Sequence, residues 1–365
     1  MNITFLIGNG FDIGVGMKSK FKDFFPVYIL HSEQKKDEIK QLSTEIGDDF
    51  ETWADFELQM GKYTEKFDPS ESQKILDQFR DFEMEFMKYL GQEEEKLSFS
   101  NMSLISSTML SALKNFYSTD NLRNQSYEDI LNVVQRKSTE RRIYNFISFN
   151  YTFVLESCLK TISDGVIESR KVNASTLKDS VGKIVHVHGT RTNGPIMGVC
   201  EPSQIVNQEL ANNNRFLRYF VKPRINIMHR NNQDRDAEKL ISSSNIICIY
   251  GMSLGVTDKN WWQKILLWLK ENTDHHLVIY NHDPNFSIIS QFDWIDKEDS
   301  ILDKLASYDD TKQIDVEALR KRIHIAVNKN IFSMDLAGQH DEIINNAVDV
   351  LKTQFDSLED VLNKI

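Results

Sequence analysis

Short, nearly continuous apolar runs recur along this chain, and helical stretches lie between several of them. Runs of this length and composition are typical of strands buried on both faces of a parallel sheet. The alternation predicts an α/β fold with a mostly parallel, doubly wound, Rossmann-like sheet. We expect strands at residues 2–7, 143–149, 183–187, 245–250, 276–281 and 322–328, and helices at 152–163, 203–221 and 258–272.

Residues 19–140 depart from this pattern and predict a large helical insertion. Between Val27 and Arg141 the only proline is Pro69, and Lys, Glu, Gln, Leu and Phe dominate, which favours helix. Apolar residues of the tail from Asp341 recur at helical spacing, so we expect that stripe to pack on the sheet or on a partner subunit. The expected domains are a Rossmann-like core of residues 1–18 and 141–335, an inserted helical subdomain of 19–140, and a C-terminal helix of 336–365.

The charge balance and the cysteine content limit the class of protein. The formal net charge of −11 disfavours general nucleic-acid binding, because phosphate repulsion must then be overcome locally. The three cysteines are widely spaced and form no CxxC pair, which is typical of reduced thiols without a disulfide framework. No apolar run of about 18 residues occurs, so we expect no membrane span and a cytoplasmic protein.

One basic group stands out in this acidic chain, and we interpret it as a solvated helix face. Recognition of a ligand's phosphates is the next interpretation, and binding of nucleic acid is the third. The residues are Arg215, Arg218, Lys222, Arg224, Arg230 and Arg235.

Each expected strand ends in a small polar or glycine-bearing cluster. Ligands of open α/β sheets bind outside the carboxyl ends of the strands, so we expect these clusters to converge on one crevice. The clusters are Gly8-Asn9-Gly10-Phe11-Asp12, Asn150-Tyr151-Thr152, His188-Gly189-Thr190, Gly251-Met252-Ser253-Leu254 and Asn281-His282-Asp283.

The first cluster predicts a phosphate-binding turn. Gly8 and Gly10 lack Cβ atoms where the chain turns tightly, and the amides at the start of the following helix favour an anionic group. The third glycine is Gly14, which does not match the spacing of hydride-transferring dehydrogenases. This disfavours an ordinary hydride-transferring domain. We expect the turn to hold a phosphate-bearing small molecule, with a nicotinamide or adenine nucleotide as the leading ligand, and a tight turn without a ligand is the alternative.

The other clusters offer polar side chains with more than one interpretation. Asp12 is expected to bind a ribose or a loop amide, or to cap a helix. Asn150 is suited to hold a sugar hydroxyl or a water, or to form an Asx turn. His188 is suited to act as a general base on a hydroxyl. Ser253 and Asp258 follow the fourth cluster as ligand contacts or as caps.

Taken in order, these clusters resemble the AbiH family of bacterial phage-defence (abortive infection) proteins over about residues 3–285. The supporting stretches are Gly8–Asp12 with Lys18-Ser19 and Phe21–Phe24, Trp53–Glu57, Phe149–Thr152, His186–Gly189, and Tyr250–Leu254 with Asp258. That family is similar, more distantly, to sirtuin-like domains that consume NAD.

The resemblance implies a role for each matching residue. It places Asn150 and His188 in catalysis, and it implies NAD as the substrate or ligand and no metal. It implies nucleotide contacts from Gly8, Asn9, Gly10, Phe11, Asp12, Thr152, Gly251, Ser253 and Asp258. Asn9 replaces the usual alanine of the sirtuin-like loop, and zinc-binding cysteines are missing, so protein deacylation is not expected.

The implied activity is hydrolysis of NAD with release of nicotinamide. A carboxamide that holds water near the ribose gains by proximity, and a histidine that takes a proton from a ribose hydroxyl stabilises the developing charge. Two alternatives stay open: a non-catalytic nucleotide sensor, and a metal-dependent hydrolase that uses His186 and His188 with His282 and Asp283. For partners, the alternatives are a homo-oligomer and a separate defence protein. Trp53 and Phe56, at helical spacing, are expected to be core residues, Glu57 is a candidate to reach the crevice without an assigned mechanism, and the role of Asp55 is open.

Overall fold

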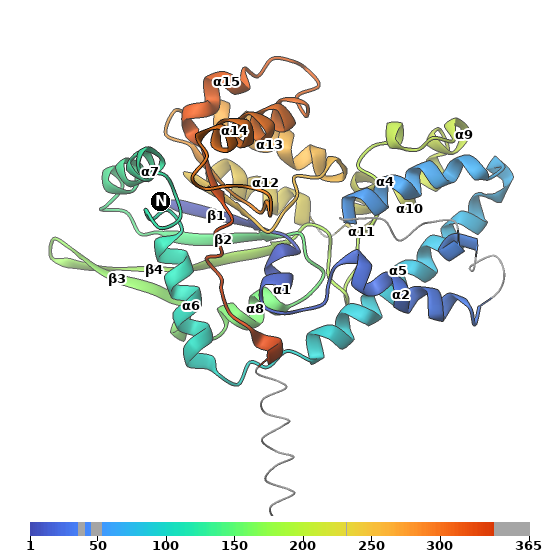
Figure 1. Cartoon of the computed structure of the whole chain (residues 1–365), viewed down its shortest axis with the longest axis horizontal. Coiled ribbons are helices and arrows are strands. Elements are labelled where there is room, and N and C mark those ends of the chain that lie inside the picture. The colour runs from blue at the N-terminus through green and yellow to red at the C-terminus, as the bar shows by residue number, and fades with distance from the viewer. Residues whose placement is uncertain (36–40, 45–52, 231, 339–365) are drawn as a thin grey trace, which may run out of the picture.

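The computed structural model describes residues 1–35, 41–44, 53–230 and 232–338, and its centre is a seven-stranded sheet (Figure 1). The strands lie in the order β3-β4-β2-β1-β5-β6-β7, and only β3 runs antiparallel to its neighbour, β4. The strands are β1 (Asn2–Ile7), β2 (Ile143–Ser148), β3 (Val166–Val172), β4 (Ser175–His186), β5 (Ile246–Tyr250), β6 (His276–Asn281) and β7 (Ile323–Val327).

The parallel strands have the connectivity of a Rossmann fold. Numbered by their order along the chain, they lie as 3-2-1-4-5-6, which is the order of dinucleotide-binding sheets. The predicted α/β, mostly parallel, doubly wound sheet is therefore confirmed. The strand order reverses between β1 and β5, and this switch point is where ligands of such sheets bind.

The register brings the strand ends together at that switch point. Ile7 at the end of β1 pairs with Ser148 of β2 and with Tyr250 of β5. Ser148 in turn pairs with His186 of β4. The polar clusters that follow these four strands consequently start at the same level of one edge of the sheet.

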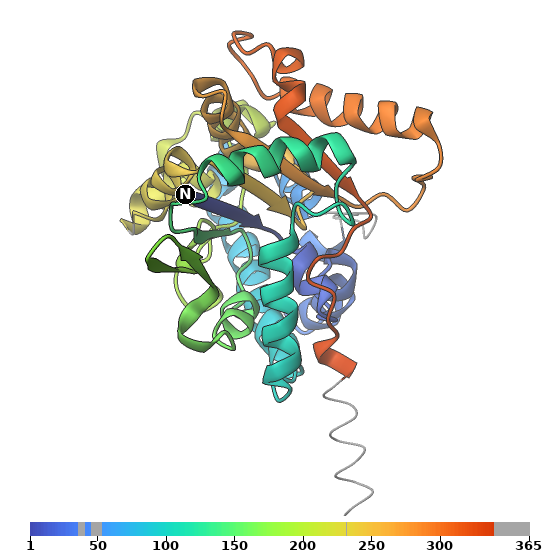
Figure 2. The same ribbon diagram turned by 90° about the vertical axis from the view of Figure 1, so that its left-hand side faces the viewer.

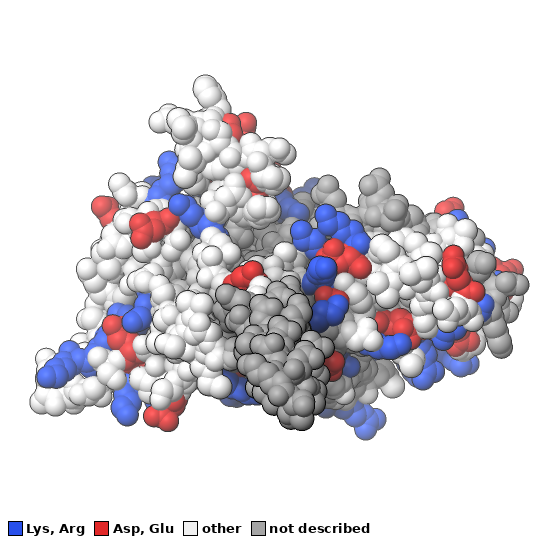
Figure 3. Space-filling view, turned by 60° about the horizontal axis from the view of Figure 1, so that its bottom comes forward, with Lys and Arg blue, Asp and Glu red and all other residues white. Residues whose placement is uncertain are grey.

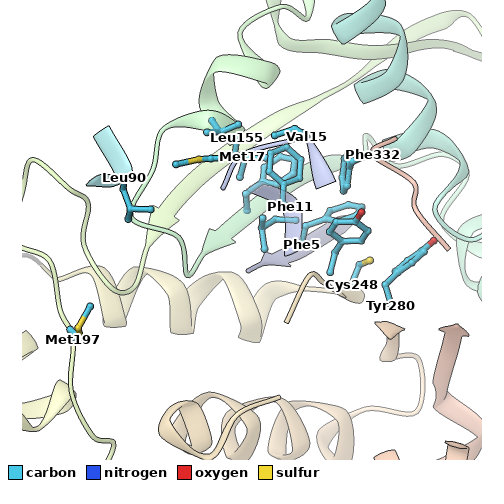
Figure 4. Packing of buried hydrophobic residues seen from close by; sticks show 14 of the residues in the cluster. Phe5, Phe11, Val15, Met17, Leu90, Leu155, Met197, Cys248, Tyr280 and Phe332 are labelled. Atoms are coloured by element: carbon cyan, nitrogen blue, oxygen red, sulfur yellow. The ribbon is translucent and has the colours of Figure 1, made fainter. Parts of the chain in front are cut away.

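The two faces of the sheet have separate cores because neighbouring residues of a strand point to opposite sides. On one face, Leu6 packs with Trp262 and Ile265 of α13 (Lys259–Glu271). On the other face, Phe5 contacts Phe116 edge-on at 5.3 Å and packs with residues of α1 (Gly10–Gly14) and α8 (Val154–Leu159), as Figure 4 shows in part.

The insertion contributes helices to two places. Helices α2 (Phe21–Ser32), α4 (Trp53–Tyr63) and α5 (Ser72–Glu95) lie to one side of the sheet, beside α9 (Gln208–Ala211) and α10 (Asn214–Phe220) from later in the chain (Figure 1). Their core is aromatic, and the rings of Phe56 and Phe82 stack at 4.3 Å. Helices α6 (Met102–Asn115) and α7 (Asn124–Arg136) return to the sheet, where α6 packs against α8 and β3 (Figure 2).

The remaining helices complete the layers and the loops. Helix α14 stands out from the rest of the molecule in Figure 2. The helices are α11 (Lys222–His229), α12 (Gln233–Ser243), α14 (Gln291–Ala306) and α15 (Val316–Leu319), and the 3-10 turns are η1 (Thr64–Lys66), η2 (Pro69–Glu71), η3 (Ser163–Gly165), η4 (Pro202–Gln204), η5 (Val256–Asp258) and η6 (Arg320–Arg322).

The expected single helix over residues 203–221 is wrong. The chain instead forms η4, α9 and α10, because asparagine side chains start new helices. Asn207 accepts the backbone amides of Glu209 and Leu210, and Asn213 does the same for α10. Strand β4 also begins earlier than expected, since its first half pairs with β3, which the sequence did not predict.

The apolar residues expected at helical spacing lie partly within the described residues. The stripe expected over residues 341–364 lies outside the described residues, as does the side chain of Trp53. Phe56, which the helical spacing also predicted to be core, is fully buried. Among the helices that the structure describes, none is long and apolar enough to cross a bilayer.

Candidate functional site

The glycine turn after β1 packs directly on the turn after β5. The amide of Gly8 donates to the carbonyl of Tyr250 at 3.0 Å, and the amide of Gly10 donates to that of Gly251 at 2.8 Å. A Cβ added to Gly10 would lie 2.5 Å from the Cα of Gly251, so the close approach of two backbones requires glycine there. The amides of both glycines are thus engaged with the carbonyls of Tyr250 and Gly251.

Two neighbours in this turn are directed away from the edge. The Asn9 side chain donates to the carbonyl of Ser19 at 2.9 Å and accepts the Ser19 hydroxyl at 2.6 Å, which braces the loop before α2. The Phe11 ring is fully buried and contacts Phe332 edge-on at 5.2 Å (Figure 4). Its side chain is therefore part of the core, and only its backbone belongs to the turn.

Asp12 is a buried carboxyl that faces the end of β2. Only 2% of the residue is exposed, and its Oδ2 accepts the hydroxyl of Thr152 at 2.6 Å. Burial raises the pKa of Asp12 to about 7, and the hydrogen bonds from Thr152 and Asn150 oppose that rise. An acid with such a pKa can bind or release a proton near neutrality.

Asn150 is held from both ends beside Asp12. Its side-chain amide donates to the carbonyl of Gly8 at 3.1 Å, and its own carbonyl lies 2.9 Å from Nδ1 of His186. The other ring nitrogen of His186 pairs with Glu156. Burial opposes protonation of His186, but its contacts with the Glu156 carboxylate and with Asn150 outweigh burial and raise its pKa above the ordinary value. His186 therefore fixes the backbone of Asn150.

His188 faces a different carboxylate from that of His186. Its Nε2 lies 2.9 Å from Oδ1 of Asp258, which belongs to the turn η5 after β5. The imidazole also contacts the Phe149 ring edge-on at 5.2 Å, and the residue is 7% exposed. A buried histidine that faces a carboxylate is a common arrangement of general bases.

The same oxygen of Asp258 also receives a buried lysine. Nζ of Lys222, the first residue of α11, lies 3.1 Å from Oδ1 of Asp258 and 2.7 Å from Oε2 of Glu57 on α4. Burial lowers the pKa of Lys222, but the two carboxylates outweigh burial and raise it above the ordinary value. Burial raises the pKa of Asp258, whereas Lys222 and His188 lower it by more. The four side chains form a buried charged network.

The structure brings most of the predicted site residues to one edge. Three are exceptions. The side chains of Asn9 and Phe11 are directed away from the edge, and Ser253 is exposed, with its carbonyl accepting a hydrogen bond from Lys304 at 2.8 Å. Asp283 pairs with Lys297 at the end of β6. The residues at the edge are Gly8, Gly10, Asp12, Asn150, Thr152, His188, Gly251 and Asp258.

Five of the six basic residues that the sequence grouped together are exposed, as expected of a solvated face. Lys222 is the exception and corrects that interpretation, because it lies in the charged network. On the face that Figure 3 shows, basic and acidic side chains are interspersed. The sequence signal for Lys222 was its position directly after the apolar Phe220 and Val221, which are buried.

A pocket of about 640 Å³ lies near this edge, between α5 and the loop after His188. Arg191 from that loop pairs with Glu94 of α5 at 2.8 Å and its amide donates to the carbonyl of Tyr151. The centroid of the Tyr151 ring lies 6.3 Å from that of the His188 imidazole and 6.0 Å from that of the Phe86 ring of α5. Residues that line the pocket are Glu83, Met87, Lys88, Gln92, Arg191 and Pro195.

The proposed pairing of His186 with His188 as metal ligands has no geometric support, since each imidazole faces its own carboxylate. Across the described ranges, no group of three or more His, Cys, Asp or Glu side chains is placed to hold a metal ion. The sequence did not identify Glu156, Glu94 or Lys222 as parts of this edge. Each of them lies on a helix whose position only the packing decides.

The fold and this edge define a Rossmann-type α/β protein with a buried, charged site at the switch point of its sheet. A family model described as bacteriophage abortive infection AbiH matches residues 4–280. The chain therefore belongs to the AbiH family, and it is an abortive-infection protein that acts against phage. A search of curated proteins finds no match.

Proposed function

We propose that this AbiH protein binds NAD at the switch point and hydrolyses the bond between nicotinamide and ribose. The observation that carries the proposal is the placement of the His188–Asp258 pair and the Asn150 carboxamide at the ends of neighbouring strands. We further propose that the site is remotely related to that of sirtuin-like domains, in which an asparagine and a histidine have these roles.

The chemistry assigned to the chain needs no general acid. Nicotinamide leaves NAD as a neutral molecule, so the barrier lies in the positive charge that develops on the ribose. Asp258 faces Nε2 of His188 and leaves Nδ1 as the nitrogen that takes a proton from a ribose hydroxyl. The carboxamide of Asn150 is suited to hold the attacking water, which gains by proximity.

Access to the site requires movement, because Asn150 and His188 are both buried. Gly251 and Leu254 have φ of +70° and +52°, and they delimit the segment that covers the glycine turn. Displacement of this segment would free the amide of Gly10, which Gly251 holds, for the pyrophosphate of the dinucleotide. We infer that the structure represents the closed state of a site that opens to its ligand.

A non-catalytic nucleotide sensor is the second candidate, and the closed site favours it. A protein that binds the nucleotide and changes shape without turnover would need the same opening of the Gly251 segment. Turnover separates the two candidates, because a sensor binds NAD with no release of nicotinamide.

The test is nicotinamide release from NAD by the purified protein, measured by chromatography alongside NAD binding by calorimetry. We expect His188→Ala and Asn150→Ala each to lower turnover by about 10²-fold or more, as removal of a catalytic base or a positioning group does. Asp258→Asn is expected to lower turnover with little effect on binding. Undiminished turnover in both alanine variants would remove the catalytic assignment, and binding without turnover would favour the sensor.

A further inference from the structure

The helical insertion supplies a residue to the buried charged network. Glu57 lies on α4, within the insertion, whereas Lys222, Asp258 and His188 all come from the part of the chain after residue 140. Both the Glu57 and the Lys222 side chains are only 7% exposed. A buried charged pair of this kind is costly unless its geometry is good, so breaking it on one side has large effects.

Helix α4 packs so closely on the backbone around Gly198 and Gln204 that a shift of the helix would also move this backbone. Oε1 of Glu57 accepts the amide of Gly198 at 3.1 Å, while its Oε2 holds Lys222. A Cβ added to Gly61, one turn along α4, would lie 2.2 Å from the carbonyl oxygen of Gln204. Helix α4 thus lies directly on the backbone of Gln204, which comes after the loop that follows β4.

Lys222 and His188 share a single oxygen atom. Both Nζ of Lys222 and Nε2 of His188 approach Oδ1 of Asp258, at 3.1 Å and 2.9 Å. Oε2 of Glu57 lies 2.7 Å from the same Nζ of Lys222. When Glu57 loses its charge, the Lys222 ammonium is attracted to Asp258 alone among these carboxylates. It then competes more strongly with His188 for Oδ1 of Asp258.

We propose that Glu57 and Lys222 are positioning residues for His188, so that the docking of α4 on the core determines whether Asp258 orients the imidazole. The insertion is then part of the site, and any partner or phage signal that lifts α4 changes the catalytic geometry. This inference rests on the proposed function for the role of His188 and on the geometry alone for the link between α4 and the imidazole.

Two substitutions break the link by different means. Glu57→Gln keeps the shape and the acceptor for the Gly198 amide but removes the charge that holds Lys222. Gly61→Ala leaves every charge in place but forces α4 away from the carbonyl of Gln204. Glu65→Gln is the matched control, because Glu65 is an exposed glutamate directly after α4.

The first readout is independent of activity. The Cε1–H resonance of His188, one of nine histidines, is identified in a carbon-proton NMR spectrum by its loss in His188→Gln. We expect this resonance to move in Glu57→Gln and Gly61→Ala and to stay in place in Glu65→Gln. An unmoved resonance in both test variants overturns the link, whether or not the protein cleaves NAD.

The second readout is the split between kcat and KM for nicotinamide release. A positioning role predicts that Glu57→Gln lowers kcat roughly tenfold or more with KM nearly unchanged, because misplacement of a catalytic group by about 1 Å can cost 10²-fold. If the resonance moves in the two test variants while the wild-type protein releases no nicotinamide, the link is supported and only the proposed activity is removed. Wild-type kcat in both test variants overturns the positioning role while leaving the proposed activity standing.

Discussion

Replacement of Asp12 by asparagine tests whether the buried carboxyl next to the glycine turn titrates near neutral pH. The test needs no assumption about the ligand. Asp12→Asn keeps the size of the side chain and an oxygen that can accept the Thr152 hydroxyl. It removes a group that is almost fully buried and titrates with a pKa of about 7. The expected change is therefore in how the free energy of unfolding depends on pH.

The magnitude follows from the two pKa values. Asp12 titrates at about 7 in the folded protein against an ordinary value of 3.8, which is worth about 4 kcal/mol at 1.36 kcal/mol per pKa unit. The folded state binds this proton more tightly than the unfolded state does. The contribution of Asp12 to stability is therefore greatest below about pH 4 and is lost as the pH rises through about 7. Burial is the main cause, and Glu94 and Glu156 add to it.

The assay is chemical unfolding at several pH values between about 4 and 8, followed by the change in tryptophan fluorescence. We expect the stability of Asp12→Asn relative to the wild type to rise by up to about 4 kcal/mol across this range. Asp120→Asn, a substitution at an exposed position, should run parallel to the wild type. A constant difference between Asp12→Asn and the wild type would refute the claim that a buried carboxyl near the turn loses its proton in this range.

Three further perturbations have outcomes fixed by particular contacts. Gly10→Ala should cost about 3 kcal/mol or more in thermal or chemical unfolding, because its Cβ meets the Gly251 backbone, whereas Gly14→Ala in the same helix should be neutral or stabilising. The buried pair of His276 and His324, with pKa values lowered to about 4 and about 3 by burial, should make the fold lose stability as the pH falls from about 6.5, and His324→Gln should reduce that loss. Asp179→Ala should cost about 3–5 kcal/mol in urea unfolding, because it removes the buried carboxylate that pairs with Arg170 and accepts the amide of Arg142.

The sequence predicted the sheet well because each core strand has a local signal. The six expected strands all occur, and their apolar runs are continuous since both faces of a parallel sheet are covered. The β3 strand was missed because its residues alternate and include several charges, as suits an edge hairpin exposed on one side. The helix expected over residues 203–221 failed because asparagine caps override average helix propensity.

The site was only partly predictable. Asn150, His188 and Asp258 could be named because they follow strands, and strand ends of one parallel sheet share an edge. The pairing of His188 with Asp258 could not, since it depends on the path of the chain after β5. Lys222 was assigned to the solvent with its basic neighbours, whereas two carboxylates from distant segments hold it inside.

The glycine turn shows most clearly which properties the sequence determines and which properties only the tertiary structure decides. The sequence by itself determined that Gly8 and Gly10 lie at a tight turn after a buried strand, because backbone geometry is a local property of the chain. Only the tertiary structure decided what approaches them, and this is the backbone of Gly251. The partners of charged side chains are likewise decided by the tertiary structure. A charge interacts with the groups within a few ångströms of it in space, and the sequence does not specify those distances.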